Sequence, residues 1–136
     1  MEKYKKFTFI IIILLFLTII CTISLSTSAH ALTTTYYTLP SSTISSLRIV
    51  QLTDLHNSEF GEVNARLVST VRDQSPDLIF LTGDLLNSDE QRTDIATDLI
   101  AKLCDIAPVY FSNGNHEIEY EERYGVDIDE LYREAG

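Results

Sequence analysis

The sequence of 136 residues predicts an α/β fold with a parallel sheet, in the order strand, helix, strand, helix, strand. Apolar, strand-like runs occupy residues 47–53, 78–81 and 109–111. Amphipathic segments at 63–75 and 95–106 separate these runs. The second run is continuously apolar, which is typical of a strand buried on both faces of a parallel sheet. This alternation of strands and helices is the pattern of α/β domains.

The two amphipathic segments have the residue spacing of helices. The first ends at Ser75-Pro76, and its apolar face comprises Val63, Leu67, Val68 and Val71. The second ends before Pro108, and its apolar face comprises Ile95, Leu99, Ile100, Leu103 and Ile106. Residues 118–136 alternate acidic, basic and aromatic side chains, so we expect one solvated helix cut short there.

The N-terminus has the pattern of a membrane-directed segment. Lys3, Lys5 and Lys6 precede an uncharged apolar run over residues 7–25. The positive-inside rule leaves the lysines in the cytoplasm and sends the rest of the chain across the membrane. Ala29-His30-Ala31 fits a signal-peptide cleavage site, but the run approaches the roughly 20 residues of a membrane span. Two interpretations stay open: a cleaved signal with a secreted domain, or a retained anchor in the cell membrane with an extracytoplasmic domain.

The chain therefore divides into three regions. Residues 1–31 form the signal peptide or membrane anchor. Residues 32–46 are rich in Ser and Thr, with Tyr36, Tyr37 and a single proline, which predicts a polar linker or an edge strand. Residues 47–136 form the α/β domain.

The charge balance limits the ligands that the protein can bind. Ten Lys and Arg residues stand against 20 Asp and Glu residues, for a net charge of −10. No basic cluster occurs outside the N-terminus, so we expect no nucleic-acid binding. A ligand that carries phosphate would need positive charge from a source other than side chains.

Three clusters of polar residues each follow a predicted strand. They are Asp54-Leu55-His56, Gly83-Asp84 and Gly114-Asn115-His116-Glu117. Parallel strands joined by right-handed crossovers place their carboxyl ends at one edge of the sheet, where open α/β folds bind ligands. Asp54 and Asp84 are 30 residues apart, and Asp84 and Asn115 are 31 apart, about one strand-helix-strand unit each. We therefore expect the three loops to converge.

The residue types in these clusters favour a metal site. Asp54, His56 and Asp84 offer two carboxylates and an imidazole, and Asn115 offers an amide oxygen. Divalent Mn, Fe or Zn accepts this mixture of ligands. A cation would also remove the repulsion between carboxylates that lie together. The alternative is structural: the aspartates would cap helices, Asn115 would fill a left-handed turn, and His56 and His116 would be loop residues hydrogen-bonded to the backbone.

The three clusters resemble the signature of the calcineurin-like metallophosphoesterase superfamily. The flanking sequences Arg48-Ile49-Val50-Gln51-Leu52 and Pro76-Asp77-Leu78-Ile79 are similar to its membrane-associated bacterial branch. The resemblance implies an α/β sandwich of two sheets. This chain would hold the N-terminal portion of that sandwich, which would be incomplete at the C-terminus. It also implies hydrolysis of a phosphoester substrate by two divalent metal ions with a bridging hydroxide.

The resemblance also assigns roles to individual residues. Asp54 and His56 would hold one metal ion, and Asp84 would bridge both. Asn115 would hold the second ion. His116 would be catalytic, protonating the leaving oxygen or stabilising the developing charge.

Two departures from the family signature bear on activity. Asn87 stands where the family has a second Asp, which affects tuning of the site rather than ligation. The family's three later histidines are absent, since the chain contains only His30, His56 and His116. The chain thus offers four of the seven ligands that the resemblance implies, so we expect little or no turnover from these 136 residues. Glu117 would cap the following helix or orient His116.

Two functional hypotheses follow from these observations. The first is a metallophosphoesterase of which this chain is a fragment. The second is a truncated, non-catalytic remnant that is anchored in the membrane and binds metal weakly, or that acts as an interaction module.

Overall fold

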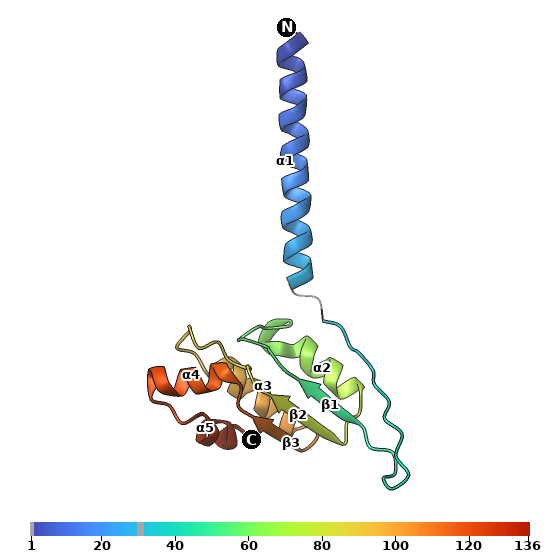
Figure 1. Ribbon diagram of the computed structural model, residues 1–136, viewed down its shortest axis with the longest axis vertical. Helices are drawn as coiled ribbons and strands as arrows, with labels where there is room; N and C mark the ends of the chain where they lie inside the picture. Colours follow the sequence, from blue (N-terminus) through green and yellow to red (C-terminus); the bar gives the residue numbers. More distant parts are fainter. Residues whose placement is uncertain (1, 30–31) are drawn as a thin grey trace. The chain divides into compact units, whose positions relative to one another are not determined.

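The computed structural model describes residues 2–29 and 32–136 of the chain (Figure 1). The chain separates into two compact units, residues 1–36 and residues 37–136. The second unit is called the globular unit below, and it contains every strand found among the described residues. Each unit is described by itself.

The first unit contains helix α1 (Glu2–Ala29). Large apolar side chains between Phe7 and Ile20 are exposed along this helix. Within the described part of the chain, no helix combines the length and apolar character needed to cross a membrane. The cleavage site expected at Ala29-His30-Ala31 lies outside the described residues.

The globular unit is built on a parallel sheet of three strands in the order β1-β2-β3. The strands are β1 (Ile49–Leu52), β2 (Leu78–Thr82) and β3 (Val109–Ser112). Helix α2 (Ala65–Asp73) connects the first two strands, and α3 (Asp94–Cys104) connects the second and third. The α/β class with strands and helices in alternation is therefore confirmed.

The register of the sheet brings the ends of the strands together. Leu52 at the end of β1 pairs with Leu81, and Leu81 pairs with Phe111 near the end of β3. All three strands run in the same direction, so the loops that follow them leave from one edge of the sheet.

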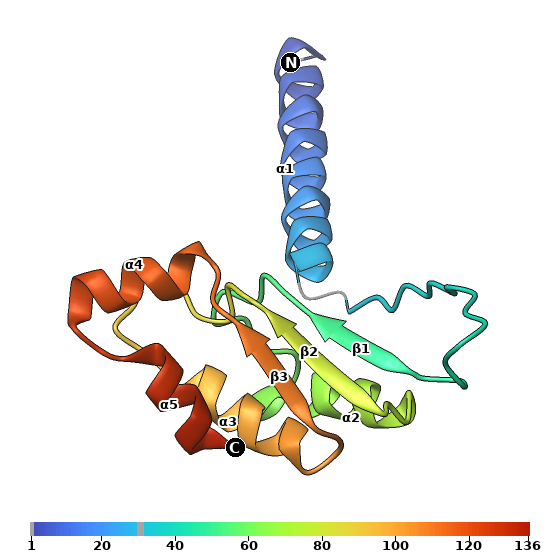
Figure 2. The same cartoon turned by 60° about the horizontal axis from the view of Figure 1, so that its bottom comes forward.

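One face of the sheet is covered by helices (Figure 2). Helix α3 packs against β3 and α2, and these helices bury the apolar stripes that the sequence predicted. Burying one large apolar side chain contributes roughly 1.5–3 kcal/mol. The centre of this core comprises Leu67, Val71, Ile79, Leu81, Leu99 and Leu103.

The opposite face of the sheet carries no helix of the globular unit, which the structure describes in full (Figure 2). Ile79 and Leu81 of β2 are fully buried, whereas Leu78 and Phe80, which point the other way, are only half-buried. Tyr110 beside Phe80 is 58% exposed. The expectation that the second strand is buried on both faces is therefore wrong, because no second layer covers this side.

Residues 32–46 form no strand, so the edge-strand interpretation of this segment is wrong. The Ser41 hydroxyl oxygen accepts the backbone N–H groups of Thr43 and Ile44, both at 3.2 Å. Amides engaged in such a local turn are not available to a β ladder. The first strand accordingly begins only at Ile49.

The helix after β1 begins later than the sequence predicted. A short 3-10 turn, η1 (Glu62–Asn64), precedes α2, and both Val63 and Asn64 have positive φ, at 50° and 59°. This backbone conformation interrupts the helical path. The buried side chain of Asn64 accepts the N–H of Phe60 at 2.9 Å and so stabilises the turn. Val63 is consequently 44% exposed. The expectation that it belongs to the apolar face of the helix is therefore wrong.

The C-terminal region forms two helices instead of the single solvated helix that the sequence predicted. Helix α4 (Asn115–Tyr124) ends at Gly125, which has φ 67° and closes the helix by donating to the Glu121 carbonyl at 2.9 Å. Helix α5 (Ile128–Ala135) begins after Asp127, whose side chain accepts the Glu130 N–H. Both helices contribute to the core, through Tyr120, Ile128 and Tyr132.

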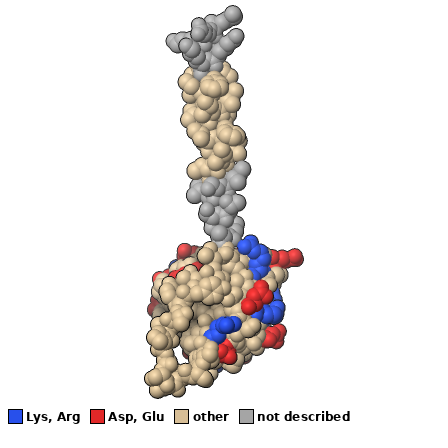
Figure 3. All heavy atoms as spheres, turned by 90° about the vertical axis from the view of Figure 1, so that its right-hand side faces the viewer, with Lys and Arg blue, Asp and Glu red and all other residues tan. Residues whose placement is uncertain are grey.

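The basic side chains of the globular unit lie among acidic ones. On the face drawn in Figure 3, Lys and Arg side chains stand beside Asp and Glu. Arg92 pairs with Asp94 at 2.9 Å, and Arg133 pairs with Asp129 at 3.3 Å. Exposed pairs of this kind add little stability, but they reduce the positive charge that is free to attract an anion.

Candidate metal centre

The loop after β1 is held against the loop after β2 by backbone hydrogen bonds. The Asp54 N–H donates to the Gly83 carbonyl at 3.2 Å, and the His56 N–H donates to the Asp84 carbonyl at 2.9 Å. Asp54, His56 and Asp84 all have positive φ, at 55°, 46° and 55°. Few residues with a Cβ adopt this conformation, although Asp and His do so more readily than most. The backbone bonds between the two loops thus hold three residues in a conformation that is uncommon outside glycine.

The loops after β2 and β3 touch through two glycines. A Cβ added to Gly83 would lie 2.6 Å from the Gly114 Cα, and a Cβ on Gly114 would overlap the Asp84 carboxylate. The His116 N–H donates to Asp84 Oδ1 at 2.9 Å. Only residues without side chains permit this close approach, which brings the third loop against Asp84.

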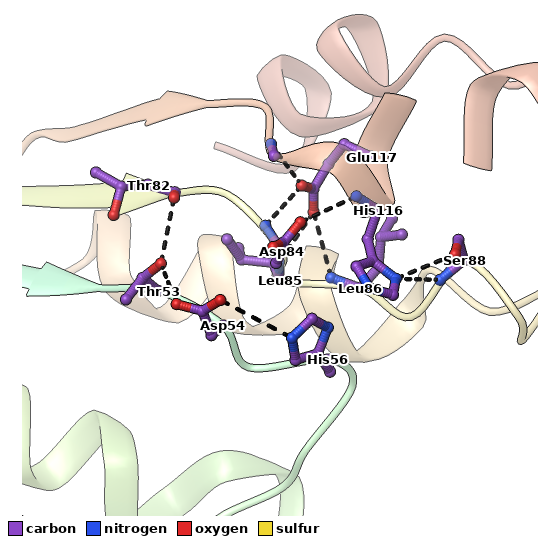
Figure 4. Close-up of polar contacts among 11 residues, drawn as sticks. Thr53, Asp54, His56, Thr82, Asp84, Leu85, Leu86, Ser88, His116 and Glu117 are labelled. Atoms are coloured by element: carbon purple, nitrogen blue, oxygen red, sulfur yellow. Dashed lines mark hydrogen bonds and ion pairs between the residues drawn. The ribbon is translucent and has the colours of Figure 1, made fainter. Parts of the chain in front are cut away.

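Asp54, His56 and Asp84 converge at the edge of the sheet (Figure 4). One ligand atom from each of these residues lies within 4.8 Å of the others. His56 Nε2 is 4.0 Å from Asp54 Oδ1, and the Thr53 hydroxyl donates to Asp54 Oδ2 at 2.8 Å. Asp54 is exposed and the other two are half-buried, so the group is open to solvent. The predicted convergence of these three side chains is confirmed.

Glu117 is fully buried beside this group and fixes the surrounding backbone. Its carboxylate accepts backbone N–H groups from two loops, at Gly114 (2.8 Å), Asp84 (2.7 Å), Leu85 (2.9 Å) and Leu86 (3.3 Å). The bond from Gly114 caps α4, as the sequence suggested. The bonds to residues 84–86 hold the loop that carries Asp84, and several such bonds compensate for burial of the carboxylate.

Tyr132 of α5 completes the partners of Glu117. Its hydroxyl donates to Glu117 Oε1 at 3.2 Å, and its side chain is 2% exposed. Burial raises the pKa of the Tyr132 phenol, and the nearby Glu117 raises it further. The phenol therefore keeps its proton and remains a hydrogen-bond donor at neutral pH.

The ring of His116 is held at the edge of the same group. It stands edge-on to the His56 ring, with the ring centroids 4.5 Å apart. The Ser88 N–H donates to His116 Nδ1 at 3.2 Å, and the Ser88 Oγ lies 3.0 Å from the same nitrogen. A backbone amide can only donate, so Nδ1 of the neutral ring accepts and Nε2 carries the hydrogen. The Nε2–H group is then the one that can donate to an oxygen.

Comparison with known proteins agrees with this geometry. Residues 47–135 match the family model described as calcineurin-like phosphoesterase. The chain belongs to the calcineurin-like phosphoesterase family. It is also similar to a Danio rerio protein named "Transmembrane protein with metallophosphoesterase domain", with 33% identity over 81 residues. That match covers 58% of this chain but only 18% of the relative, so the chain spans less than a fifth of that protein's length. No solved structure gives a significant match.

The donor set fits the divalent metal that a calcineurin-like phosphoesterase implies. Carboxylate oxygens and imidazole nitrogens bind Zn at about 2.0–2.2 Å, so two ligands of one ion lie at most about 4.4 Å apart. The atoms of Asp54, His56 and Asp84 are within 4.8 Å of one another, so small side-chain movements would suffice to enclose an ion. Two carboxylates and one imidazole suit a hard or borderline divalent cation.

Two asparagines stand at positions of the family signature, Asn115 as the signature has it and Asn87 in place of an Asp, and they have different surroundings. Asn115 is the exposed first residue of α4, next to His116 and therefore at the same edge of the sheet. Its role as a ligand of a second ion stays a prediction. The Asn87 side chain accepts the Asp89 N–H at 3.1 Å. Asn87, which stands where the family has its second Asp, thus stabilises a local turn with its side chain.

Two residues that the sequence did not indicate contribute to this candidate site. Ser88 contacts the His116 ring and is 1% exposed, but an isolated serine after a turn carries no signal of such a contact. Tyr132 lies on α5, whose spacing of Ile128, Leu131 and Tyr132 is that of an amphipathic helix. That spacing could have revealed the helix, although not its contact with Glu117.

Proposed function

We propose that this chain carries part of the active site of a metal-dependent phosphoesterase. The observation that carries the proposal is the convergence of Asp54, His56 and Asp84 from two loops to within 4.8 Å. Membership of the calcineurin-like phosphoesterase family supports a hydrolase. Divalent metal ions at such a site activate water and offset negative charge on the phosphoryl group. They would also supply the positive charge that this acidic chain lacks.

In this proposal the sheet edge holds two divalent ions of Mn, Fe or Zn. Asp54 and His56 would hold one ion, Asp84 would be a ligand of both, and Asn115 would contribute to the second. Support for the position of Asp84 comes from its place between the other two loops, since its carbonyl accepts from His56 and its carboxylate accepts from His116.

His116 acts in this proposal as the catalytic residue that donates a hydrogen bond to the leaving oxygen. Its Nδ1 is occupied by Ser88, so the Nε2–H group is the one available to the oxygen of the leaving group. The contact of its ring with His56 supports a location beside the metal ligands. A neutral donor at this place would stabilise negative charge that develops as the phosphoester bond breaks.

The alternative is a non-catalytic domain that binds metal, or an interaction module. The observation in its favour is that the described residues gather three ligands, enough to bind an ion without supplying a complete dinuclear site. This alternative predicts metal binding without hydrolysis, or neither, whereas the phosphoesterase predicts both for the full-length gene product.

Metal binding and hydrolysis are tested with matched aspartate variants. Asp84→Asn removes one negative ligand but keeps an oxygen to cap α4, and we expect it to weaken Mn²⁺ binding to the chain by at least about tenfold in calorimetry. Asp98→Asn, on an exposed position of α3, makes the same change of charge and serves as the control. Hydrolysis of p-nitrophenyl phosphate and its bis ester by the full-length gene product should fall at least about 100-fold in Asp84→Asn. Undiminished binding and turnover in that variant would refute the assignment of Asp84.

The N-terminal region is proposed to direct the chain to a membrane. Exposed apolar side chains along α1 and the lysines before them support this role, as does the printed name of the Danio rerio relative. Mass spectrometry of the protein from cell fractions would separate a retained segment in the membrane from a cleaved, secreted product. Recovery of the intact chain from the cytosolic fraction would contradict both.

A further inference from the structure

We propose that Ser88, together with Glu119, positions the ring of His116, and this inference rests on the catalytic role proposed above for that histidine. Ser88 is almost fully buried, with 1% exposure, and both its N–H and its hydroxyl oxygen contact His116 Nδ1, at 3.2 and 3.0 Å. The hydroxyl donates to Glu119 Oε2 at 2.9 Å. A carboxylate acceptor strengthens such a bond and fixes the orientation of the hydroxyl. The single hydroxyl hydrogen goes to Glu119, so the Ser88 N–H is the donor to the ring nitrogen, and the bond to Glu119 holds the residue that carries this N–H.

These contacts stabilise one of the two possible orientations of the His116 imidazole ring. Rotating the His116 ring by half a turn would place a C–H group against the Ser88 N–H, which would lose its acceptor. That loss is costly because the serine is buried. The edge contact with His56 limits the ring from the other side. Ser88 thus determines both the orientation of the ring and the nitrogen that carries its hydrogen.

The residues that hold Ser88 come from the same helix as the histidine. His116, Glu119 and Arg123 are spaced by three and four residues along α4, which places them on one face of the helix. Arg123 donates to the Ser88 carbonyl at 2.6 Å and to Asp89 Oδ1 at 2.7 Å. One helix face thus carries the catalytic side chain and also holds the loop that orients it.

The arrangement also accounts for the asparagine at position 87. The Asn87 side chain serves a turn with Asp89, so the neighbouring Ser88 contacts the histidine. The acidic partner is Glu119, which accepts from the serine hydroxyl and so holds the residue whose N–H contacts the ring. The network therefore functions without a carboxylate at position 87.

Ring nitrogen NMR of the chain labelled with ¹⁵N-histidine tests the inference without any need for activity. The spectra are recorded in detergent micelles at a pH where the rings are neutral, and His116→Asn assigns the signal. In the wild type we expect Nδ1 to have the shift of an unprotonated nitrogen and Nε2 that of a protonated one. Both variants, Ser88→Ala and Glu119→Gln, keep the Ser88 N–H but remove or weaken the bond to Glu119 that holds Ser88 in place, so each should move the two shifts part of the way toward each other. Ser69→Ala, at an exposed position of α2, should leave them unchanged.

Kinetics of the full-length gene product provide the second measurement. We expect Ser88→Ala and Glu119→Gln to lower kcat about tenfold each with KM unchanged, and the double variant to lose little more, because both act through one ring. If Ser88→Ala fails to fold, the exposed Glu119 still provides the test. Unchanged ring shifts in Glu119→Gln would overturn the inference. A wild type without turnover would instead refute the proposed function while the spectra still report on the ring.

Discussion

The contact between Gly83 and Gly114 sets how closely the second and third loops approach each other. Their backbones leave no room for a Cβ on either residue, and Asp84 lies directly against Gly114. The candidate metal group of Asp54, His56 and Asp84 depends on this approach, since Asp84 is a member of the group and also accepts from His116. A single methyl group on Gly114 would therefore displace the Asp84 carboxylate.

Gly114→Ala should separate metal binding from ordinary backbone strain. Gly114 has φ −96°, which alanine adopts readily, so the cost comes from overlap of the new Cβ with Asp84, about 1–3 kcal/mol. Mn²⁺ affinity should fall by at least about tenfold. Gly125→Ala is the control: its φ is 67° and no atom lies within 4 Å of an added Cβ. Strain there costs about 1–2 kcal/mol without an effect on Mn²⁺ binding. Urea denaturation measures the stability of the two variants, and calorimetry measures their Mn²⁺ affinity. Equal Mn²⁺ affinities of Gly114→Ala and Gly125→Ala would contradict the proposed geometry.

At the scale of elements, α5 supports the site through one side chain. Tyr132 on this helix donates to Glu117, and Glu117 holds the backbone of the loop that carries Asp84. The Tyr132 ring also packs edge-on against Phe111 of β3, with centroids 5.4 Å apart. Helix α5 is therefore connected through Glu117 to the loop that carries Asp84, although it contributes no residue to the candidate metal group.

Tyr132→Phe should lower stability at neutral pH and reduce its dependence on alkaline pH. The lost bond to a buried carboxylate costs about 1–3 kcal/mol. The pKa of the phenol is raised in the folded state, so its contribution is fully present below the ordinary pKa of about 10. As pH rises above that value the unfolded chain loses the proton first, and stability falls. Urea denaturation at pH 7 and above pH 10 should therefore show a smaller alkaline loss in Tyr132→Phe. A similar alkaline loss of stability in the wild type and in Tyr132→Phe would contradict this account. The control is Tyr110→Phe, because the Tyr110 side chain is exposed.

The elements that the sequence predicted are those with local signals. The strands and the helices between them follow from apolar runs and from proline or glycine at their ends, as at Pro108. The left-handed backbone of Val63 was not predictable, because a β-branched residue rarely adopts it. The division of the C-terminal region at Gly125 was missed because its buried aromatic residues alternate with charged ones.

The candidate site divides in the same way. Asp54, His56 and Asp84 were predicted because each follows a strand and parallel strands end at one edge. Ser88 and the bonds of Glu117 to residues 84–86 depend on contacts between loops about 30 residues apart in sequence. Such contacts have no local pattern, so only the folded structure revealed them.

At the scale of the whole globular unit, the sheet is covered on one side only. Leu81 of β2 is fully buried beneath the helices, while Tyr110 of β3 on the other face is 58% exposed. Stability therefore comes from the covered face, and the open face exposes apolar side chains such as Ile49 to solvent. Apolar residues that are neighbours on an open sheet face favour association with other apolar surfaces.

Substitutions on the two faces should accordingly differ in cost. Leu81→Ala leaves a cavity in the core and should lower the free energy of unfolding by about 2–5 kcal/mol. Tyr110→Thr keeps a residue suited to strands and loses mainly its edge contact with Phe80, with ring centroids 6.0 Å apart, which is worth about 0.5–1.5 kcal/mol. Urea denaturation of both variants measures the difference. A cost for Tyr110→Thr as large as that for Leu81→Ala would mean that the open face is covered in solution, because only a buried aromatic ring loses that much when it is truncated.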